Sequence, residues 1–181
     1  MNTTEQEATN PTDVPGEDPA GRGQIAGLIG WVVICFLAGG IGALASLNAP
    51  TFYAELVRPA WAPPAAVFGP VWTFLYALMA VSGWLIWRER EQLVARRALV
   101  LFVLQLAINA LWSWLFFAWH LGSVSFLDII LLWGLIANTA IVFAGIRPLA
   151  AVLLVPYLAW VTFAAALNYV IWQLNPGLLG N

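Results

Sequence analysis

Five long apolar stretches, separated by short polar or proline-containing breaks, set the pattern of this chain. Each stretch has the roughly 20 mainly apolar residues that a helix needs to cross a bilayer. Because lipid offers no partner to an unpaired backbone group, the economical arrangement is a set of packed helices. The pattern therefore predicts an all-α membrane protein, a bundle of five transmembrane helices. The predicted spans are residues 25–47, 67–87, 98–119, 124–145 and 149–172.

Composition supports this class and separates a polar tail from the membrane domain. The 181 residues are 62% hydrophobic and 9% charged, whereas soluble domains are about 45–50% apolar and about 25% charged. Residues 1–23 are acidic, rich in Pro and Gly and free of aromatic residues, so we expect a disordered tail. This tail lacks the basic start and cleavage pattern of a signal peptide. Residues 24–175 are the predicted membrane domain, and residues 176–181 a short C-terminal tail.

The positive charges predict the orientation. The chain has seven arginines and no lysine, and six of the arginines fall on the side shared by the N-terminus and the second and fourth loops. Arg58 alone lies on the other side. The positive-inside rule then places the N-terminus in the cytoplasm and the proline-rich connector between the first two spans outside. The six arginines are Arg22, Arg88, Arg90, Arg96, Arg97 and Arg147.

The charge and the metal-ligating residues exclude several classes of function. No basic stripe is present that could follow a nucleic-acid backbone, so nucleic acid is not an expected partner. A single cysteine, Cys35, excludes an intramolecular disulfide, and with only one histidine, His120, we expect no metal site.

Tryptophan and a few polar residues gather at one depth of the predicted bundle. The chain has eleven tryptophans, and most of those near span ends fit the usual preference for the membrane interface. Following the alternating direction of the spans, Trp72, Asn109, Trp112 and Trp160 fall toward the side of the proline-rich connector "RPAWAPPAAVFGPVW". Aromatic walls with few polar groups are typical of ligand pockets. The residues alone leave open whether these aromatics line a pocket or pack helix against helix.

Three further residues have two interpretations each. Asp128, one turn inside the fourth span, is a functional candidate because buried charges are costly, but it could equally cap its helix or reach headgroups. Asn168, like Asn109, could contribute to a pocket or hydrogen-bond across helices, and we favour the second interpretation. His120, in the turn between the third and fourth spans, is expected to be a solvated loop residue rather than a haem ligand.

Small residues recur every four positions in the first span. Such faces let backbones approach closely, either inside the bundle or against a second subunit, and we favour a homodimer. The positions are Ala38, Gly42 and Ser46, with Gly39 and Ala43 beside them.

Three segments together resemble the translocator protein family, also called tryptophan-rich sensory proteins (TspO/MBR). They are "FYAELVRPAWAPPAAVFGPVWTFLYALM", "QLAINALWSWLFF" and "VPYLAWVTFAAALNYVIW", and the likeness runs from about residue 35 to 172. The resemblance implies a five-helix bundle, commonly dimeric, with a cavity closed by the first connector. Members bind porphyrins, haem, sterols and synthetic ligands. By matching position, the implied ligand contacts are Trp61, Pro63, Trp72, Asn109, Trp112, Trp160, Ala164 and Leu167.

Two details refine what the resemblance implies. Arg58, at the rim of the connector, could pair with the carboxylates of a porphyrin. The family's proposed sterol motif is incomplete, since Leu167 and Tyr169 are present but Gln173 stands where a basic residue is expected.

The expected function is a binding or regulatory protein of the membrane that senses or sequesters tetrapyrroles, with porphyrin or haem as ligand and no obligatory cofactor. The alternative is a transporter of porphyrins or other amphiphiles, and a structural scaffold is a third interpretation. No nucleophile–base pair supports catalysis. Some relatives are associated with light-dependent porphyrin breakdown; if that occurs here, Trp72 and Trp160 are the candidates by position.

Overall fold

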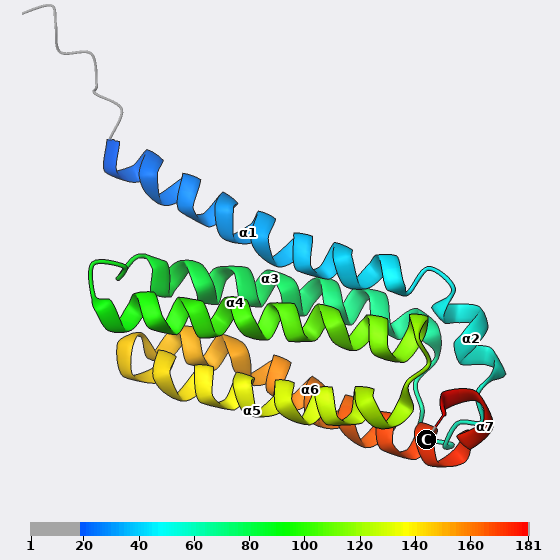
Figure 1. The fold of residues 1–181 in the computed structure, drawn as a ribbon. Helices are drawn as coiled ribbons and strands as arrows, with labels where there is room; N and C mark the ends of the chain where they lie inside the picture. The colour runs from blue at the N-terminus through cyan, green and yellow to red at the C-terminus, as the bar shows by residue number, and fades with distance from the viewer. Residues whose placement is uncertain (1–18, 181) are drawn as a thin grey trace, which may run out of the picture.

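Five long helices form the body of the protein in a computed structural model, which describes residues 19–180. All five are long and apolar enough to cross a membrane. They run side by side in alternating directions (Figure 1). The fold is thus the predicted all-α membrane bundle. The helices are α1 (Pro19–Ala45), α3 (Phe68–Trp87), α4 (Leu93–Ser113), α5 (Gly122–Ile146) and α6 (Pro148–Leu174).

The helix ends differ from the predicted spans mainly at their charged sides. Helix α1 begins at Pro19, so residues 19–23, which we expected in the tail, are helical; proline is well tolerated in a first helical turn. Helix α4 begins five residues before its predicted span and includes Arg96 and Arg97. Arginine can remain in a membrane helix near its end, because its long side chain reaches out to water. Residues 1–18 of the predicted tail lie outside the described residues.

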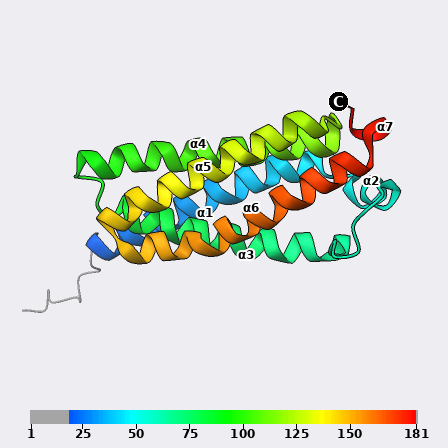
Figure 2. The same ribbon diagram turned by 90° about the horizontal axis from the view of Figure 1, so that it is seen from below.

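The bundle is ordered by which helices contact each other. Helix α5 packs between α4 and α6, while α3 packs against α1 and α6. Helix α1 lies on α3 and α4 and not on the α5–α6 pair, as the two views in Figures 1 and 2 agree. This leaves one whole side of α1 uncovered, including Ile29, Val33 and Leu37.

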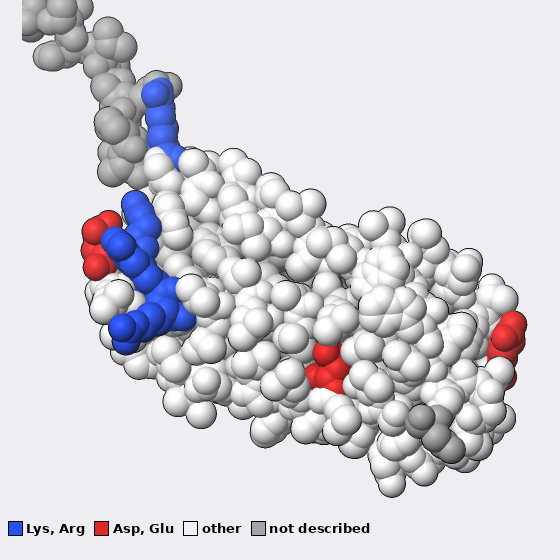
Figure 3. All heavy atoms as spheres, viewed as in Figure 1, with Lys and Arg blue, Asp and Glu red and all other residues white. Residues whose placement is uncertain are grey.

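The two ends of the bundle differ in charge. At one end, which we call the arginine end, the N-terminus of α1 meets the α3–α4 and α5–α6 loops, where Arg147 Nε donates a hydrogen bond of 2.9 Å to Glu89 Oε1. Figure 3 shows basic side chains gathered at this end and a flank that is almost entirely uncharged. The opposite end, which carries the segment between α1 and α3, is called the connector end.

Glycines on α1 allow close packing inside the subunit. A Cβ atom on Gly39 would lie 2.6 Å from the ring of Tyr76, and one on Gly42 would lie 3.0 Å from Ser113 Oγ. Two members of the small-residue pattern therefore face α3 and α4 within the bundle. A Cβ atom on Gly40 would meet no other atom within 4 Å, because this glycine lies on the open side of the helix. The close approach that the pattern predicts is used inside the subunit, and the homodimer stays a prediction.

The connector between α1 and α3 is an ordered cap and not a continuous helix. It contains the short helix α2 (Ala49–Glu55), an irregular segment and the 3-10 turn η1 (Ala65–Val67). The irregular segment begins at Leu56, as the density of prolines predicts, since proline fixes φ and donates no N–H. A second cluster of buried side chains joins α2 to the turn that follows α4, to the end of α6 and to the residues after α6: Phe52, Tyr53, Leu56, Phe116, Leu167, Ile171 and Leu179.

Side-chain hydrogen bonds fasten the connector at two points. The Tyr53 hydroxyl donates to the carbonyl oxygen of Pro63 at 3.0 Å. Asn175, just beyond the C-terminal end of α6, accepts the N–H of Val57 at 2.8 Å and donates to the Val57 carbonyl oxygen, also at 2.8 Å. The Asn175 side chain thus pairs with the connector backbone as a neighbouring strand would. This asparagine is followed by the short helix α7 (Pro176–Leu179).

Candidate functional site

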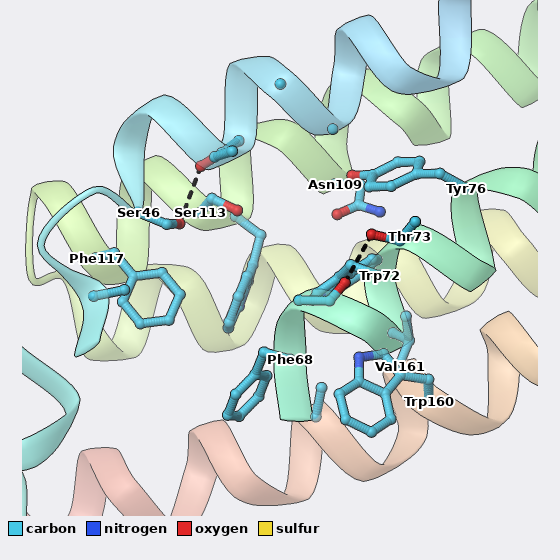
Figure 4. A pocket seen from close by; sticks show the side chains of 18 of the residues that line it. Ser46, Phe68, Trp72, Thr73, Tyr76, Asn109, Ser113, Phe117, Trp160 and Val161 are labelled. Atoms are coloured by element: carbon cyan, nitrogen blue, oxygen red, sulfur yellow. Dashed lines mark hydrogen bonds between the residues drawn. The ribbon is translucent and has the colours of Figure 1, made fainter. Parts of the chain in front are cut away.

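A cavity of about 570 Å³ lies inside the connector half of the bundle. Its walls come from α1, α3, α4, α5 and α6, and α2 and η1 of the connector close one end of it. Figure 4 shows Trp72 near the middle of this space, with Tyr76 and Asn109 on one side of it and Phe68 and Trp160 on the other. The volume falls within the range of about 300–1,000 Å³ that small-molecule sites occupy.

Five residues predicted to contact a ligand meet in this cavity. They come from three helices: one from α3, two from α4 and two from α6. The depth argument from chain direction had placed four of them at a common level, and the resemblance to the family added Ala164. They are Trp72, Asn109, Trp112, Trp160 and Ala164.

The aromatic rings form a connected wall. The ring centroid of Trp72 lies 5.6 Å from that of Tyr76 and 6.2 Å from that of Tyr157. The ring of Trp160 lies 5.9 Å from that of Phe68, in an edge-to-face arrangement. These separations are within the 4.5–7 Å of favourable aromatic pairs. The pairs hold the rings in place and leave a broad apolar surface for a flat ligand.

Two of the polar groups near the cavity are already bonded to the protein. Asn109 Nδ2 donates to the Tyr157 hydroxyl at 2.8 Å, and Trp112 Nε1 donates to Asn168 Oδ1 at 2.9 Å. These bonds link α4 to α6, as predicted for asparagines that hydrogen-bond across helices. The Asn109 amide N–H is therefore committed to the scaffold, while its Oδ1 atom has no partner among the described residues.

Other polar groups of the wall remain available. Among the described residues, the indole N–H groups of Trp72 and Trp160 and the hydroxyl of Tyr76 make no hydrogen bond to protein. These three groups are also not completely enclosed by protein atoms. Buried polar groups are normally hydrogen-bonded. We conclude that these three groups can donate to an acceptor inside the cavity.

The cavity carries no formal charge. None of the described residues that line it is an arginine, an aspartate or a glutamate. An anionic group enclosed here would lose its hydration without a counter-charge, which is costly. The wall therefore suits a mostly apolar ligand whose acceptor groups meet Trp72, Trp160 and Tyr76, with any charge left near an opening.

The exposed part of the wall indicates where that opening lies. The lining residues on α4, α5 and α6 are buried or half-buried, whereas several on α1 and α3 are exposed, including Phe36, Gly40, Gly69 and Thr73. Gly40 and Gly69 have no atom within 4 Å of an added Cβ. The cavity therefore opens sideways, between α1 and α3.

The connector closes the end of the cavity through Tyr53. This residue is buried, lines the cavity and packs edge-to-face on Phe68 at 5.5 Å. Burial raises the pKa of Tyr53 above its ordinary value, an effect that the nearby Arg58 partly opposes. The phenol thus stays protonated at neutral pH and can donate to the Pro63 carbonyl.

Four predicted site residues lie outside the wall. Trp61 is 50% exposed and meets Phe163 at 5.7 Å, while Leu167 is buried in the cluster beneath α2. Pro63 serves as the carbonyl partner of Tyr53. The guanidinium of Arg58 lies over the Tyr53 ring, 4.6 Å from its centroid. Their contact with a ligand stays a prediction, and Arg58 remains at the rim through its contact with a cavity residue.

Some wall residues were missed from the sequence. Tyr76 follows Trp72 by four residues and so lies on the same helix face, a spacing that could have found it. Gly39 and Phe36 line the cavity from α1, where only close packing was expected. For Tyr53, nothing in the sequence indicated a place in the cavity wall beyond its position in the connector.

The remaining candidate residues lie elsewhere. Asp128 is 8% exposed, its Oδ2 atom is buried without a hydrogen-bond partner, and it is not among the described residues lining the cavity. His120 is exposed in the turn after α4, as expected, but stacks on Phe52 at 4.2 Å. Cys35 is fully buried. Within residues 19–180, no group of three His, Cys, Asp or Glu side chains could hold a metal ion.

The fold and the cavity define a class: a multi-pass helical membrane protein with a capped aromatic cavity. Comparison with known proteins gives the family. Residues 31–173 match the TspO/MBR family. The chain belongs to this family, which confirms the predicted membership.

Individual relatives agree over most of the bundle. The chain is 42% identical over 129 residues to the tryptophan-rich protein TspO of Chlorobaculum tepidum, covering 69% of this chain and 80% of the relative. It is 42% identical over 131 residues to the translocator protein of Ovis aries, covering 70% and 76%. Protein CrtK of Rhodobacter capsulatus is 36% identical over 148 residues, covering 81% and 91%.

Proposed function

We propose that this protein binds tetrapyrroles, porphyrin or haem, and other flat hydrophobic ligands in the aromatic cavity, and that it acts in sensing or sequestration. The observation that carries the proposal is the wall itself: two indole N–H groups, on Trp72 and Trp160, without a protein partner among the described residues, in an uncharged cavity of about 570 Å³. The chain belongs to the TspO/MBR family, and the resemblance to that family implies the same class of ligand.

A porphyrin suits both the shape and the polarity of this wall. Its macrocycle is a flat π-system that can stack on the Trp72 or Trp160 ring, an arrangement worth about 0.5–1.5 kcal/mol per aromatic pair beyond area burial. Its two carboxylates need donors or water. Because no described arginine lines the cavity, the carboxylates would lie at the opening between α1 and α3 or toward Arg58 at the connector.

The route of access follows from the same opening. A hydrophobic ligand dissolved in the bilayer would reach the cavity between Gly40 of α1 and Gly69 of α3, while the connector, fastened by Asn175, covers the other end. This arrangement favours a protein that takes its ligand from the membrane and holds it. Retention of this kind is what sensing or sequestration requires.

Orientation and assembly are further parts of the proposal. The gathering of arginines at the arginine end supports a cytoplasmic N-terminus and an external connector. The uncovered side of α1, with Ile29, Val33 and Leu37 exposed, supports a homodimer that uses this helix.

A porphyrin titration tests the binding proposal. The purified full-length protein is titrated with protoporphyrin IX, following both tryptophan quenching and the Soret absorbance. We expect saturable binding that weakens about fivefold or more in Trp72→Phe and Trp160→Phe, since each variant loses an indole donor and part of its stacking surface. Trp133→Phe is the matched control, because Trp133 donates to Thr162 on the flank and does not line the cavity.

Two results would contradict the proposal. One is quenching that rises linearly with porphyrin and never saturates, as expected for partition into detergent or lipid. The other is an equal loss of affinity in Trp133→Phe and the two cavity variants, which would place the ligand elsewhere.

A further inference from the structure

A second cavity, of about 590 Å³, lies on the surface at the connector end. It is bounded by the end of α1, by α2 and by the π-helical turn η2 (Trp114–Ala118) that follows α4. It shares only Phe117 with the aromatic cavity among the residues described as lining the two. Nothing in the function proposed above uses this second cavity.

The second cavity spans the level at which two membrane helices end. The apolar spans of α1 and α4 end at Ala45 and Ala118, and both residues line it. Its apolar wall includes Leu44, in the last turn of α1, and Leu47, just beyond that helix, which are 61% and 76% exposed. Its polar wall comes from α2 and the residues beside it, and includes Asn48, Thr51 and Glu55. A molecule with an apolar part and a polar head would match this change from one wall to the other.

The local backbone holds aromatic rings around the polar side. In η2 the Trp119 N–H donates to the Trp114 carbonyl oxygen at 2.9 Å, five residues back, so the last turn of the helix is widened. The chain then turns at His120, which has a positive φ of 54°. The His120 ring is thereby stacked on Phe52 of α2, with the centroids 4.2 Å apart. Both rings line the cavity, together with the indole of Trp114.

The charge of the lining selects the ligand. Glu55 is the only acidic or basic side chain other than His120 among the described residues that line this cavity. No ion pair or hydrogen bond of its carboxylate is found among the described residues. A carboxylate beside aromatic faces is a suitable environment for an ammonium group, which is attracted by both. A phosphate or carboxylate placed there would instead be repelled.

We propose that the second cavity binds the ammonium headgroup of a zwitterionic phospholipid, phosphatidylethanolamine or phosphatidylcholine, from the leaflet at the connector end. The ammonium pairs with Glu55 and lies against the face of Trp114, beside the stacked rings of Phe52 and His120. The phosphate points to water, and the acyl chains follow the exposed Leu44 and Leu47 into the bilayer. The apolar wall identifies a lipid as the source of the amine and disfavours a small soluble amine.

Native mass spectrometry of the full-length protein in detergent tests this site. The protein is titrated with phosphatidylethanolamine, phosphatidylcholine and the anionic phosphatidylglycerol, all with the same acyl chains. We expect the first bound lipid to be one of the two ammonium lipids, preferred about five- to tenfold over phosphatidylglycerol.

Variants separate the charge from the aromatic surface. Glu55→Gln should reduce the preference for ammonium lipids to less than about twofold, while Trp114→Leu should weaken binding of the ammonium lipids and retain the charge. Glu91→Gln is the matched control, since it removes one exposed carboxylate at the arginine end and should leave the preference intact. Far-UV circular dichroism checks that each variant keeps its helices.

Three outcomes would overturn the proposal. Equal binding of all three lipids by the unmodified protein would remove the selectivity. An unchanged preference in both Glu55→Gln and Trp114→Leu would place the lipid site elsewhere. Displacement of the lipid by millimolar phosphoethanolamine or phosphocholine would show that the cavity recognises a soluble amine and not a lipid.

Discussion

The most direct test of how the connector is held is replacement of Asn175 by alanine. The Asn175 side chain is buried and bonds both the N–H and the C=O of Val57 at 2.8 Å, across 118 positions of the chain. Its amide also donates to Ile171 within the end of α6. Alanine removes all three bonds, but only the two to Val57 join the connector to the bundle.

The size of the effect follows from those two bonds. A typical hydrogen bond contributes about 0.5–1.5 kcal/mol net, so loss of the pair should lower the free energy of connector opening by about 1–3 kcal/mol. Since 1.4 kcal/mol is a factor of ten, the open population should rise roughly fivefold to a hundredfold. The Val57 amide, itself a donor in one of the bonds, reports this opening directly.

Hydrogen–deuterium exchange of the detergent-solubilised protein is the assay. Exchange in the connector peptide around Val57 should accelerate by the stated factor, while the interior of α5 and α6 stays protected, because local opening does not require global unfolding. Asn175→Asp keeps an acceptor for the Val57 N–H but loses both donors, so its exchange should be intermediate. Gln173→Ala, an exposed change at the same end of α6, is the control.

Two results would refute the reasoning. If connector exchange is the same in Asn175→Ala and in the unmodified protein, the buried cluster beneath α2 holds the connector without the asparagine. If the interior of α5 and α6 exchanges faster by the same factor as the connector, the substitution has destabilised the whole bundle and not a separate cap.

Three other changes test neighbouring features. Tyr53→Phe removes one hydrogen bond inside the connector but keeps the ring, and should accelerate connector exchange about fivefold; unchanged exchange would mean that the bond contributes nothing to closure. Arg58→Ala should weaken protoporphyrin about two- to fivefold while sparing its uncharged dimethyl ester in the same titration; equal losses would remove the rim role. Gly39→Ala should lower the free energy of unfolding by about 1–3 kcal/mol in thermal melts, because its methyl group would meet the Tyr76 ring. Gly40→Ala, which meets open space, should not, and equal melts for the two glycine variants would contradict the packing argument.

The helices were predictable because the bilayer sets their length. All five spans were located within about six residues at each end, since a run of about 20 apolar residues has no other economical structure in lipid. The depth of the cavity residues within the bundle was predictable too. Alternating chain direction placed Trp72, Asn109 and Trp160 at one level, and they meet there.

Rotation of each helix about its axis was not predictable from composition or periodicity. A helix that is apolar all round gives no periodic signal for its inward face, because lipid and protein interior are both apolar. Leu167 and Ala164 are both buried on α6, three residues apart, yet only Ala164 lines the cavity. The bonds of Asn175 were equally hidden, since a side chain that pairs with distant backbone follows no sequence pattern.

The aromatic cavity is closed at one end by the connector and opens sideways between α1 and α3. This arrangement explains why the connector is rich in proline and aromatic residues. A cap that must exclude water needs little freedom of its own, and proline reduces the entropy lost when the segment is ordered. Tyr53 and Asn175 then fix this stiff segment with three hydrogen bonds. The side between α1 and α3, in contrast, is lined in part by the small residues glycine and threonine. The cavity is thus closed by a rigid cap at the connector end and is open on the side between α1 and α3, which faces lipid. A ligand would therefore be exchanged with the bilayer more easily than with water. Under the proposed function, stiffening the cap should therefore slow the loss of a bound porphyrin far less than narrowing the α1–α3 opening would.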